Sequence, residues 1–303
     1  MTRLALLAVS AFCLFSAPAL AQDRVTLGWG RLFSNDAIGD GADRWRTGAY
    51  AVSMIRGTRW DGRLPDAPGQ MLEFRLRSDT IAPENLEAPA TIDRRYAGAI
   101  SLGLHSQFAP GGFEADVGAD LVFVGPQTGV GRFQSWVHGA LGMGEVGALD
   151  DQIEDAVYPT VSGELARRFA LGDRVEVRPF VEARAGDETL LRAGGDLVIG
   201  GFGRNDLMLR DVATGQRFRG VAGSALSGVS VVLGGDIARV FDSVYLPDGE
   251  AVTASDTRHR LRAGVHWQGA KSSLFYGVTY LSPEFDEQSE GQITGALSLN
   301  LRF

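Results

Sequence analysis

Cysteine and lysine are almost absent from this 303-residue chain. The single cysteine is Cys13, in the N-terminal apolar stretch, and the single lysine is Lys271. A disulfide framework within the mature chain is therefore excluded. Arginine carries nearly all of the positive charge, and the net charge of −8 argues against nucleic acid as a partner.

Long apolar runs are missing beyond the N-terminus. A transmembrane helix needs about 18 or more consecutive apolar residues, and none follows residue 21. At the start, one arginine precedes an apolar stretch over 4–15, and small residues at 19 and 21 form a cleavage site. This pattern predicts a secretory signal peptide over residues 1–21 and a mature domain over 22–303. A lipoprotein signal is disfavoured because the cysteine lies inside the apolar stretch.

Alternation of polar and apolar residues is the strongest pattern that is present. From residue 293 to 303, Ile293, Leu297 and Leu299 share one face, and the polar residues share the other. Segments 113–123, 72–77 and 258–267 repeat the pattern, with Asp, Glu or Arg opposite the apolar residues. Counting such segments predicts twelve strands, near 25–33, 46–57, 70–80, 96–108, 113–124, 156–169, 174–186, 190–202, 228–241, 257–268, 272–283 and 292–303.

These strands are too long for an ordinary soluble sandwich, whose strands average about 5–6 residues. Strands of about ten residues in an exported chain fit an all-β, twelve-stranded antiparallel transmembrane β-barrel with apolar residues toward lipid. The sheet has to close, because an open edge would leave backbone groups unpaired in hydrocarbon. The charged faces then line the lumen and favour a filled barrel over an open pore. The segment 203–227 is too long for a turn and is left unassigned.

Residues of chemical interest gather in the loops at one predicted end of the barrel. With both termini in the periplasm, the outward loops are 34–45, 81–95, 125–155, 187–189, 242–256 and 284–291. Ser34-Asn35-Asp36, Asp43-Arg44-Trp45-Arg46-Thr47-Gly48 and Asp93-Arg94-Arg95-Tyr96 all belong to this end. Taken singly, Asn-Asp after a strand is usual turn chemistry. Their common location predicts one site.

The third external loop contains a short helix by its spacing. In GPQTGVGRFQSWVHGALG, residues 125–142, the apolar residues recur at helical intervals, with Gln134 and His138 four apart along one edge. Such a pair is also common as the polar flank of an amphipathic helix. The sequence has no G-x-S-x-G, no H-E-x-x-H and no paired Cys/His set, which removes the commoner hydrolase and zinc sites.

Together these motifs resemble the lipid A 3'-O-deacylase family of Gram-negative outer membranes, the LpxR-type barrels. The resemblance covers nearly the whole mature chain and is carried by SND, DRWRTG, TIAPENLEAPATIDRRYAG, the 125–142 segment with the following DDQI, and the terminal SPEF…LSLNLRF. It implies a Ca²⁺-dependent ester hydrolase of the outer membrane, and we expect the protein to be a monomer. Its substrate would be lipid A, the anchor of lipopolysaccharide in the outer leaflet.

The resemblance also implies roles for individual residues. His138 matches the histidine that acts as general base, Gln134 the glutamine one turn before it, and Thr47 the threonine of the polar pocket. Asn35 and Asp36 match residues of the metal site. Such a site is chemically sound, since a neutral imidazole can accept a proton from water and an oxygen-bound cation can polarise an ester.

Two positions depart from the family pattern. Gly144 stands where a metal-binding glutamate is expected, and Glu145, one residue later, is the substitute ligand that we predict. The loop 81–95 contains no lysine where the family has one, although Arg94 and Arg95 lie in it. Two alternatives to a deacylase therefore stay open: a barrel without catalytic activity, with a structural or lipid-binding role, and a phospholipase.

Overall fold

The computed structural model describes residues 24–223 and 227–301 of the chain. The predicted signal peptide, residues 1–21, and the terminal Phe303 lie outside the described residues. The main sheet has 13 strands, of which β7 (Phe169–Leu171) only extends the hairpin before β8. The other twelve form the barrel, which closes where β6 pairs antiparallel with β8. The predicted fold class is confirmed.

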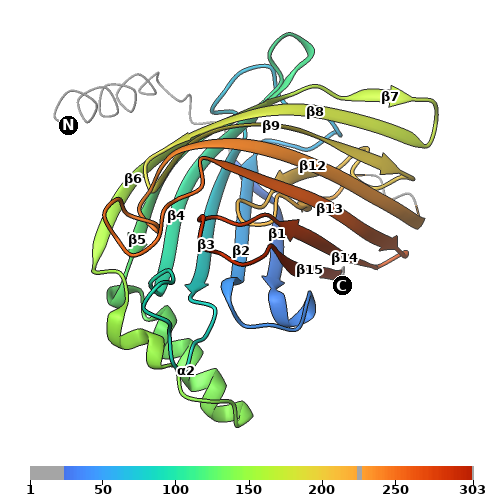
Figure 1. Cartoon of the computed structure of the whole chain (residues 1–303). Coiled ribbons are helices and arrows are strands. Elements are labelled where there is room, and N and C mark those ends of the chain that lie inside the picture. The colour runs from blue at the N-terminus through green and yellow to red at the C-terminus, as the bar shows by residue number, and fades with distance from the viewer. Residues whose placement is uncertain (1–23, 224–226, 302–303) are drawn as a thin grey trace, which may run out of the picture.

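The barrel strands run antiparallel around the wall in chain order (Figure 1). They are β1 (Val25–Asn35), β2 (Trp45–Gly57), β3 (Leu72–Ala82), β4 (Ala97–Phe108), β5 (Glu114–Val124), β6 (Ala156–Ala166), β8 (Val175–Ala185), β9 (Glu188–Ile199), β12 (Gly228–Ser243), β13 (Thr257–Gln268), β14 (Ser272–Leu281) and β15 (Gln292–Leu301). We call the end where β1 begins and β15 ends the terminal end, and the opposite end the helix end.

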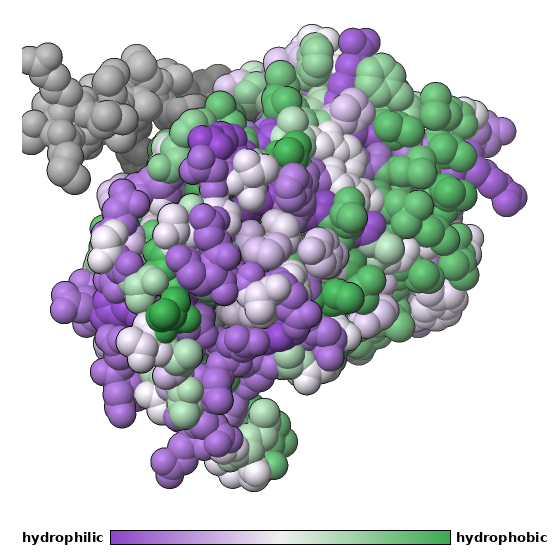
Figure 2. Space-filling model, viewed as in Figure 1, coloured by the Kyte–Doolittle hydropathy of each residue, from purple (hydrophilic) through white to green (hydrophobic). Residues whose placement is uncertain are grey.

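The alternation places apolar side chains outside and charged side chains inside, as predicted. On β3, Phe74 is 43% exposed and its neighbour Glu73 is fully buried; on β13, Leu261 is 63% exposed and Arg260 only 4%. Figure 2 shows apolar residues gathered over the outer wall at the right of the view, whereas the loops at the lower left are mainly polar. An apolar exterior over strands of this length is the surface that a bilayer requires.

Ion pairs fill much of the lumen. Arg260 and Arg262 both pair with Asp236, Arg210 pairs with Asp196 at 2.8 Å, and Arg184 pairs with Asp187 at 2.7 Å. Charges buried in this way are tolerated because each of these arginines faces a carboxylate. The prediction of a filled barrel is confirmed.

The unassigned segment 203–227 supplies a hairpin that enters the lumen. Its strands, β10 (Leu207–Arg210) and β11 (Arg217–Val221), pair only with each other. Phe218 is 1% exposed and packs among apolar side chains of the wall. Near the hairpin tip, the Gln216 side chain donates to the Thr279 hydroxyl at 3.2 Å. The segment is long because it crosses the barrel interior instead of joining two strands directly.

The helices belong to the loops of the helix end. They are η1 (Asp36–Ile38), η3 (Pro126–Thr128), α2 (Val130–Leu141) and η4 (Gly147–Asp151); η2 (Pro110–Gly112) lies in a turn of the terminal end. α2 packs on the ends of β3 and β4 and extends beyond the barrel at the bottom left of Figure 1. Among the described residues, no helix is long and apolar enough to cross a membrane.

Candidate functional site

Asp43 is the centre of a polar cluster at the helix end. Its Oδ1 accepts hydrogen bonds from the Thr47 hydroxyl at 2.6 Å and from the Gln134 side-chain amide at 3.2 Å. Its Oδ2 lies 2.8 Å from Nε2 of His138. The structure therefore brings three predicted catalytic residues, Thr47, Gln134 and His138, onto one carboxylate.

A second carboxylate, Asp36, lies on the other side of Thr47. The Thr47 hydroxyl is 2.8 Å from Asp36 Oδ1, and the backbone N–H of Arg44 donates to Asp36 Oδ2 at 2.8 Å. Burial raises the pKa of Asp36 to about 7, with repulsion from Asp43 adding to it and the two hydrogen bonds opposing it. Because one hydroxyl has one proton and faces two carboxylates, a proton or a cation is needed to hold them together.

Asn35 has a local role beside this cluster. Its side-chain oxygen accepts a hydrogen bond from the backbone N–H of Ala37 at 2.8 Å and so caps η1. The cap fixes the first turn after β1, where Asp36 follows. In this arrangement Asn35 positions Asp36, and its own amide oxygen is already engaged.

The backbone between Asp43 and Thr47 is unusual. Trp45 has φ of 50°, the only positive φ of a residue other than glycine among the described residues, and the pairing of β2 with β3 shifts register between Trp45 and Gly48. The Trp45 side chain is 1% exposed, and the Arg44 guanidinium lies 4.3 Å above its ring. A non-glycine residue persists in this conformation only when its surroundings fix it. The bend lets Asp43 and Thr47 face the same point.

α2 turns its polar edge toward the barrel and its apolar stripe outward. His138 is 7% exposed, whereas Phe133 and Trp136 are 63% and 67% exposed. A side chain at Gly131 would come within 2.6 Å of Leu149 and 3.3 Å of Tyr96, so glycine permits this close contact. The helix ends at Gly142, whose φ of 68° is a left-handed conformation that glycine adopts readily.

Both ring nitrogens of His138 face oxygen acceptors. Nδ1 lies 3.1 Å from the carbonyl oxygen of Gly144, and Nε2 faces Asp43. A neutral imidazole has one N–H, so it donates to one of these oxygens and presents a lone pair to the other. In the tautomer that carries the proton on Nδ1, the Gly144 carbonyl accepts that N–H, and Nε2 is then the nitrogen that can exchange a proton within the cluster.

Glu145 is not part of this cluster. It is exposed, and its side chain forms no hydrogen bond or ion pair within the described part of the chain. The space beside Gly144 is filled by Glu87 from the loop after β3: a Cβ on Gly144 would lie 1.6 Å from Glu87 Oε1. The carboxylate nearest to position 144 therefore comes from a different loop.

The two arginines of the lysine-free loop are engaged elsewhere. Arg94 is buried and pairs with Glu284 at 2.5 Å, whereas Arg95 pairs with Asp151 at 3.2 Å and with Glu250 at 3.3 Å. Neither contacts Asp43. Arg44, which follows Asp43 in sequence, is the arginine whose backbone joins the cluster, and its guanidinium pairs with Glu290 at 3.0 Å.

Sequence reasoning missed two residues of the site. Asp43 was visible only as part of the DRWRTG motif, and nothing in its spacing shows that it joins strand β2 to the helix. Tyr96 is fully buried beneath α2, and its hydroxyl has no hydrogen-bond partner within the described residues. Burial and then the charge of Asp43 raise the pKa of Tyr96, so its hydroxyl stays a hydrogen-bond donor.

The metal-ligating atoms at this cluster are of the type that a hard cation prefers, but the cluster has only a few of them. Asp36, Asp43 and Thr47 offer oxygen atoms, which Ca²⁺ prefers, and a buried and a half-buried carboxylate sharing one hydroxyl would be stabilised by positive charge. Across residues 24–223 and 227–301, however, no group of three or more His, Cys, Asp or Glu side chains has the geometry of a metal site. A cation here would need ligands from water or from a neighbouring carboxylate.

Comparison with known proteins places this arrangement among outer-membrane barrels. Residues 6–303 match the family described as outer membrane protein LpxR. The structure of LpxR from Salmonella typhimurium superposes with a TM-score of 0.74 at 20% identity, covering 91% of this chain and 100% of that chain, which shows a shared fold. The KdgM porin reaches a TM-score of 0.40 at 7% identity, covering 91% of this chain and 98% of its own. None of the curated proteins compared matches the chain.

Proposed function

The chain belongs to the LpxR family of outer-membrane proteins, and from this premise we propose that it hydrolyses the 3'-linked acyloxyacyl ester of lipid A. The observation that carries the proposal is the meeting of His138, Gln134 and Thr47 on Asp43 at the helix end. A polar site of this kind beside an apolar barrel wall would face the outer leaflet, where lipid A lies.

His138 supplies the general base in this proposal. The Gly144 carbonyl, 3.1 Å from Nδ1, fixes the ring, and Asp43 stabilises the imidazolium that forms when Nε2 takes a proton from water. The resulting hydroxide attacks the ester carbonyl carbon. The same proton then goes to the leaving sugar oxygen as the carbon–oxygen bond breaks, which yields a free hydroxyl and a carboxylic acid that loses its proton to water at neutral pH.

The remaining cluster residues bind and orient the reacting groups. Asp36, Asp43 and Thr47 would hold Ca²⁺, which when bound polarises an ester carbonyl and stabilises its negative charge. Gln134 lies one helical turn before His138 and holds Asp43 by a hydrogen bond at 3.2 Å. This bond keeps the carboxylate aimed at the imidazole. Tyr96, a buried donor, adds a protonated hydroxyl beneath the helix.

The outer face of α2 supports a lipid substrate. Phe133 and Trp136 stack with ring centroids 5.8 Å apart, and together with Leu141, which is 70% exposed, they present an apolar edge to the surroundings. In a water-soluble protein this edge would pack inward. Here the histidine edge packs inward, so a lipid acyl chain entering beside α2 would meet apolar side chains outside and the polar cluster within.

Mass spectrometry of lipopolysaccharide is the direct test. Cells expressing the protein should contain lipid A that has lost the mass of the 3'-acyloxyacyl group, and His138→Ala should restore intact lipid A. The matched control is His259→Ala, since His259 is an exposed residue of the outer wall. Unchanged lipid A in cells with properly inserted wild-type protein would support a non-catalytic barrel. Loss of acyl chains from glycerophospholipids instead would indicate a phospholipase.

A further inference from the structure

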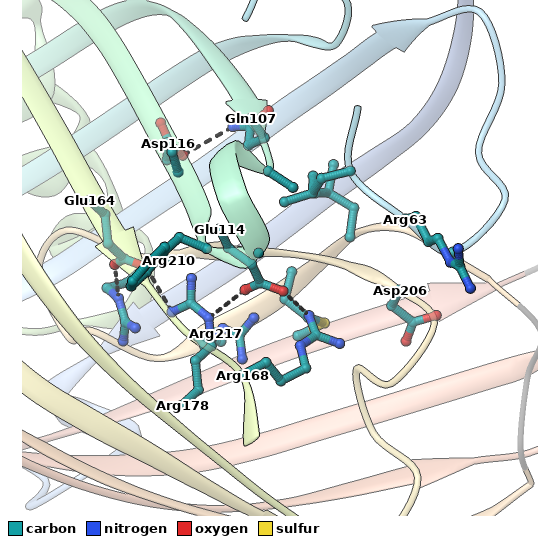
Figure 3. Close-up of a pocket in the computed structure, with 18 of the residues that line it drawn as sticks. Arg63, Gln107, Glu114, Asp116, Glu164, Arg168, Arg178, Asp206, Arg210 and Arg217 are labelled. Carbon is teal, nitrogen blue, oxygen red and sulfur yellow. Dashed lines mark hydrogen bonds and ion pairs between the residues drawn. The ribbon is translucent and has the colours of Figure 1, made fainter. Parts of the chain in front are cut away.

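A second polar cavity lies toward the terminal end of the barrel, away from the Asp43 cluster. It has a volume of about 430 Å³ and is bounded by the turn after β2, the turn between β4 and β5, and the lumen hairpin β10–β11. Arginine and glutamate side chains from β5, β6, β8 and the hairpin meet in it (Figure 3). Nothing in the proposed deacylation uses this cavity.

The glutamates in the cavity are shared between arginines. Glu114 lies 2.7 Å from Arg168 and 2.7 Å from Arg178. Glu164 lies 2.7 Å from Arg178 and 2.5 Å from Arg210. Each carboxylate is thus covered by two guanidinium groups, and the centre of the wall presents N–H donors more than acceptors.

Arg217, on β11, lines this cavity but forms no ion pair with a carboxylate among the described residues. Its side chain reaches this cavity wall and is 7% exposed, yet it forms no hydrogen bond or ion pair within residues 24–223 and 227–301. Figure 3 shows Arg217 beside Arg168 and Arg178, close to Glu114. A second donor is only weakly engaged: Nε of Arg168 is buried without a hydrogen-bond acceptor and is held by an ion pair with Glu176 at 3.5 Å.

A buried guanidinium without a directly bonded anion is costly, because its charge has left water and the carboxylates of Asp196 and Glu114 attract it only from beyond ion-pair distance. Arg217 is also held near other arginines, which adds repulsion. A bound anion would accept hydrogen bonds from the open side of Arg217 and from Arg168 at the same time. Guanidinium forks match the paired oxygens of a phosphate group particularly well.

We propose that this cavity is a binding site for a phosphate group, with Arg217 as its principal ligand and Arg168 and Arg178 at its sides. Inorganic phosphate and the headgroup of a phospholipid share this chemistry. The site would be independent of the cluster around His138, because the two lie at different ends of the barrel and have no residue in common.

Titration of the refolded, detergent-solubilised mature protein tests the proposal. Inorganic phosphate, added at constant ionic strength against sodium chloride, should bind and raise the unfolding temperature of the wild type. Arg217→Gln should weaken phosphate binding about tenfold to hundredfold, as expected for a charged hydrogen-bond donor. Arg59→Gln is the control, since Arg59 is an exposed arginine of the same end that does not line the cavity. It should bind phosphate like the wild type.

Stability without phosphate gives a second readout. Because replacing Arg217 breaks no ion pair, the Arg217→Gln variant should unfold in phosphate-free buffer at the same temperature as the wild type or at a higher one. A parallel titration with short-chain phosphatidylglycerol distinguishes inorganic phosphate from a phospholipid headgroup as the ligand. Competition between the lipid and phosphate identifies the headgroup as a ligand, and a lack of competition restricts the site to the free anion. Equal phosphate binding by Arg217→Gln, or none by the wild type, would overturn the proposal, as would a lower unfolding temperature of the variant in phosphate-free buffer.

Discussion

Replacing Asp43 by asparagine tests how the candidate site works. The substitution keeps the size of the side chain and removes its charge, so the contacts to Thr47, Gln134 and His138 are retained in shape. What is lost is the negative charge 2.8 Å from Nε2 of His138. If this charge stabilises the imidazolium formed during catalysis, the variant should, at a Ca²⁺ concentration that saturates both proteins, bind substrate normally and turn it over slowly.

The size of the effect follows from the kind of hydrogen bond that is lost. A bond to a charged group contributes about 1.5–3 kcal/mol, and a neutral one about 0.5–1.5 kcal/mol. The Asp43 side chain is 28% exposed, which screens the charge and keeps the difference below its maximum of about 2.5 kcal/mol, at about 1–2 kcal/mol. Since about 1.4 kcal/mol is a factor of ten in rate, kcat should fall about fivefold to thirtyfold with little change in KM.

The assay is release of the acyloxyacyl chain from purified lipopolysaccharide in mixed micelles, followed by mass spectrometry over time. Glu290→Gln serves as the charge control, because it removes a negative charge from the same end of the barrel and pairs with Arg44 instead of His138. The control should keep the wild-type rate. If Asp43→Asn turned over as fast as the wild type, the charge of Asp43 would have no part in the reaction. A rise in KM at constant kcat would assign Asp43 to substrate binding.

Three further results are expected. Deacylation should stop on adding chelator and return with Ca²⁺, and activity of metal-free protein would reject the cation. Glu145→Gln should raise the Ca²⁺ concentration required for activity if the exposed Glu145 side chain turns toward the cation. Glu87→Gln should raise it instead if Glu87, the carboxylate beside Gly144, is the ligand. Trp136→Ser should slow deacylation about tenfold to hundredfold on membrane-bound lipopolysaccharide but little on detergent-dispersed substrate, because burying a large apolar side chain contributes about 1.5–3 kcal/mol. Equal losses on both substrates would contradict docking of α2 into lipid. Burial favours a high pKa for Glu284, but Arg46, Arg258 and Arg94 lower the pKa to about 2. The stability that ionised Glu284 contributes is therefore complete above its ordinary pKa of 4.5 and is lost as the pH falls from there toward 2. The unfolding temperature should drop over this pH range, and it should drop less steeply in Glu284→Gln.

The barrel could be predicted because alternation is a local property. In a strand, a residue that faces lipid is followed by one that faces the lumen. The adjacent residues Glu73 and Phe74 therefore already indicate which face of the barrel wall each occupies. Strand length then separates a membrane barrel from a soluble sandwich. The same logic gave the short helix at 130–141, since its spacing differs from that of every strand around it.

The lumen hairpin and the orientation of α2 depended on the tertiary structure. β10 and β11 are too short for a clear alternating pattern, and their burial comes from the surrounding wall. The spacing on α2 shows an apolar stripe and a polar edge but not which of them packs inward. In this structure the polar edge meets the barrel and Phe133 and Trp136 face outward, which is the reverse of a surface helix in a water-soluble protein.

The sequence by itself determined which residue types were available for chemistry: His138 and Gln134 one turn apart, Thr47 in its motif, and Asn35 with Asp36 after the first strand. Only the tertiary structure decided that Asp43 joins three of them and that Glu145 stays outside while Glu87 lies beside Gly144. The reason is physical. Spacing along a chain fixes which side chains share a face, whereas a contact between segments 91 residues apart, as between Asp43 and Gln134, depends on how loops fold over the end of the barrel.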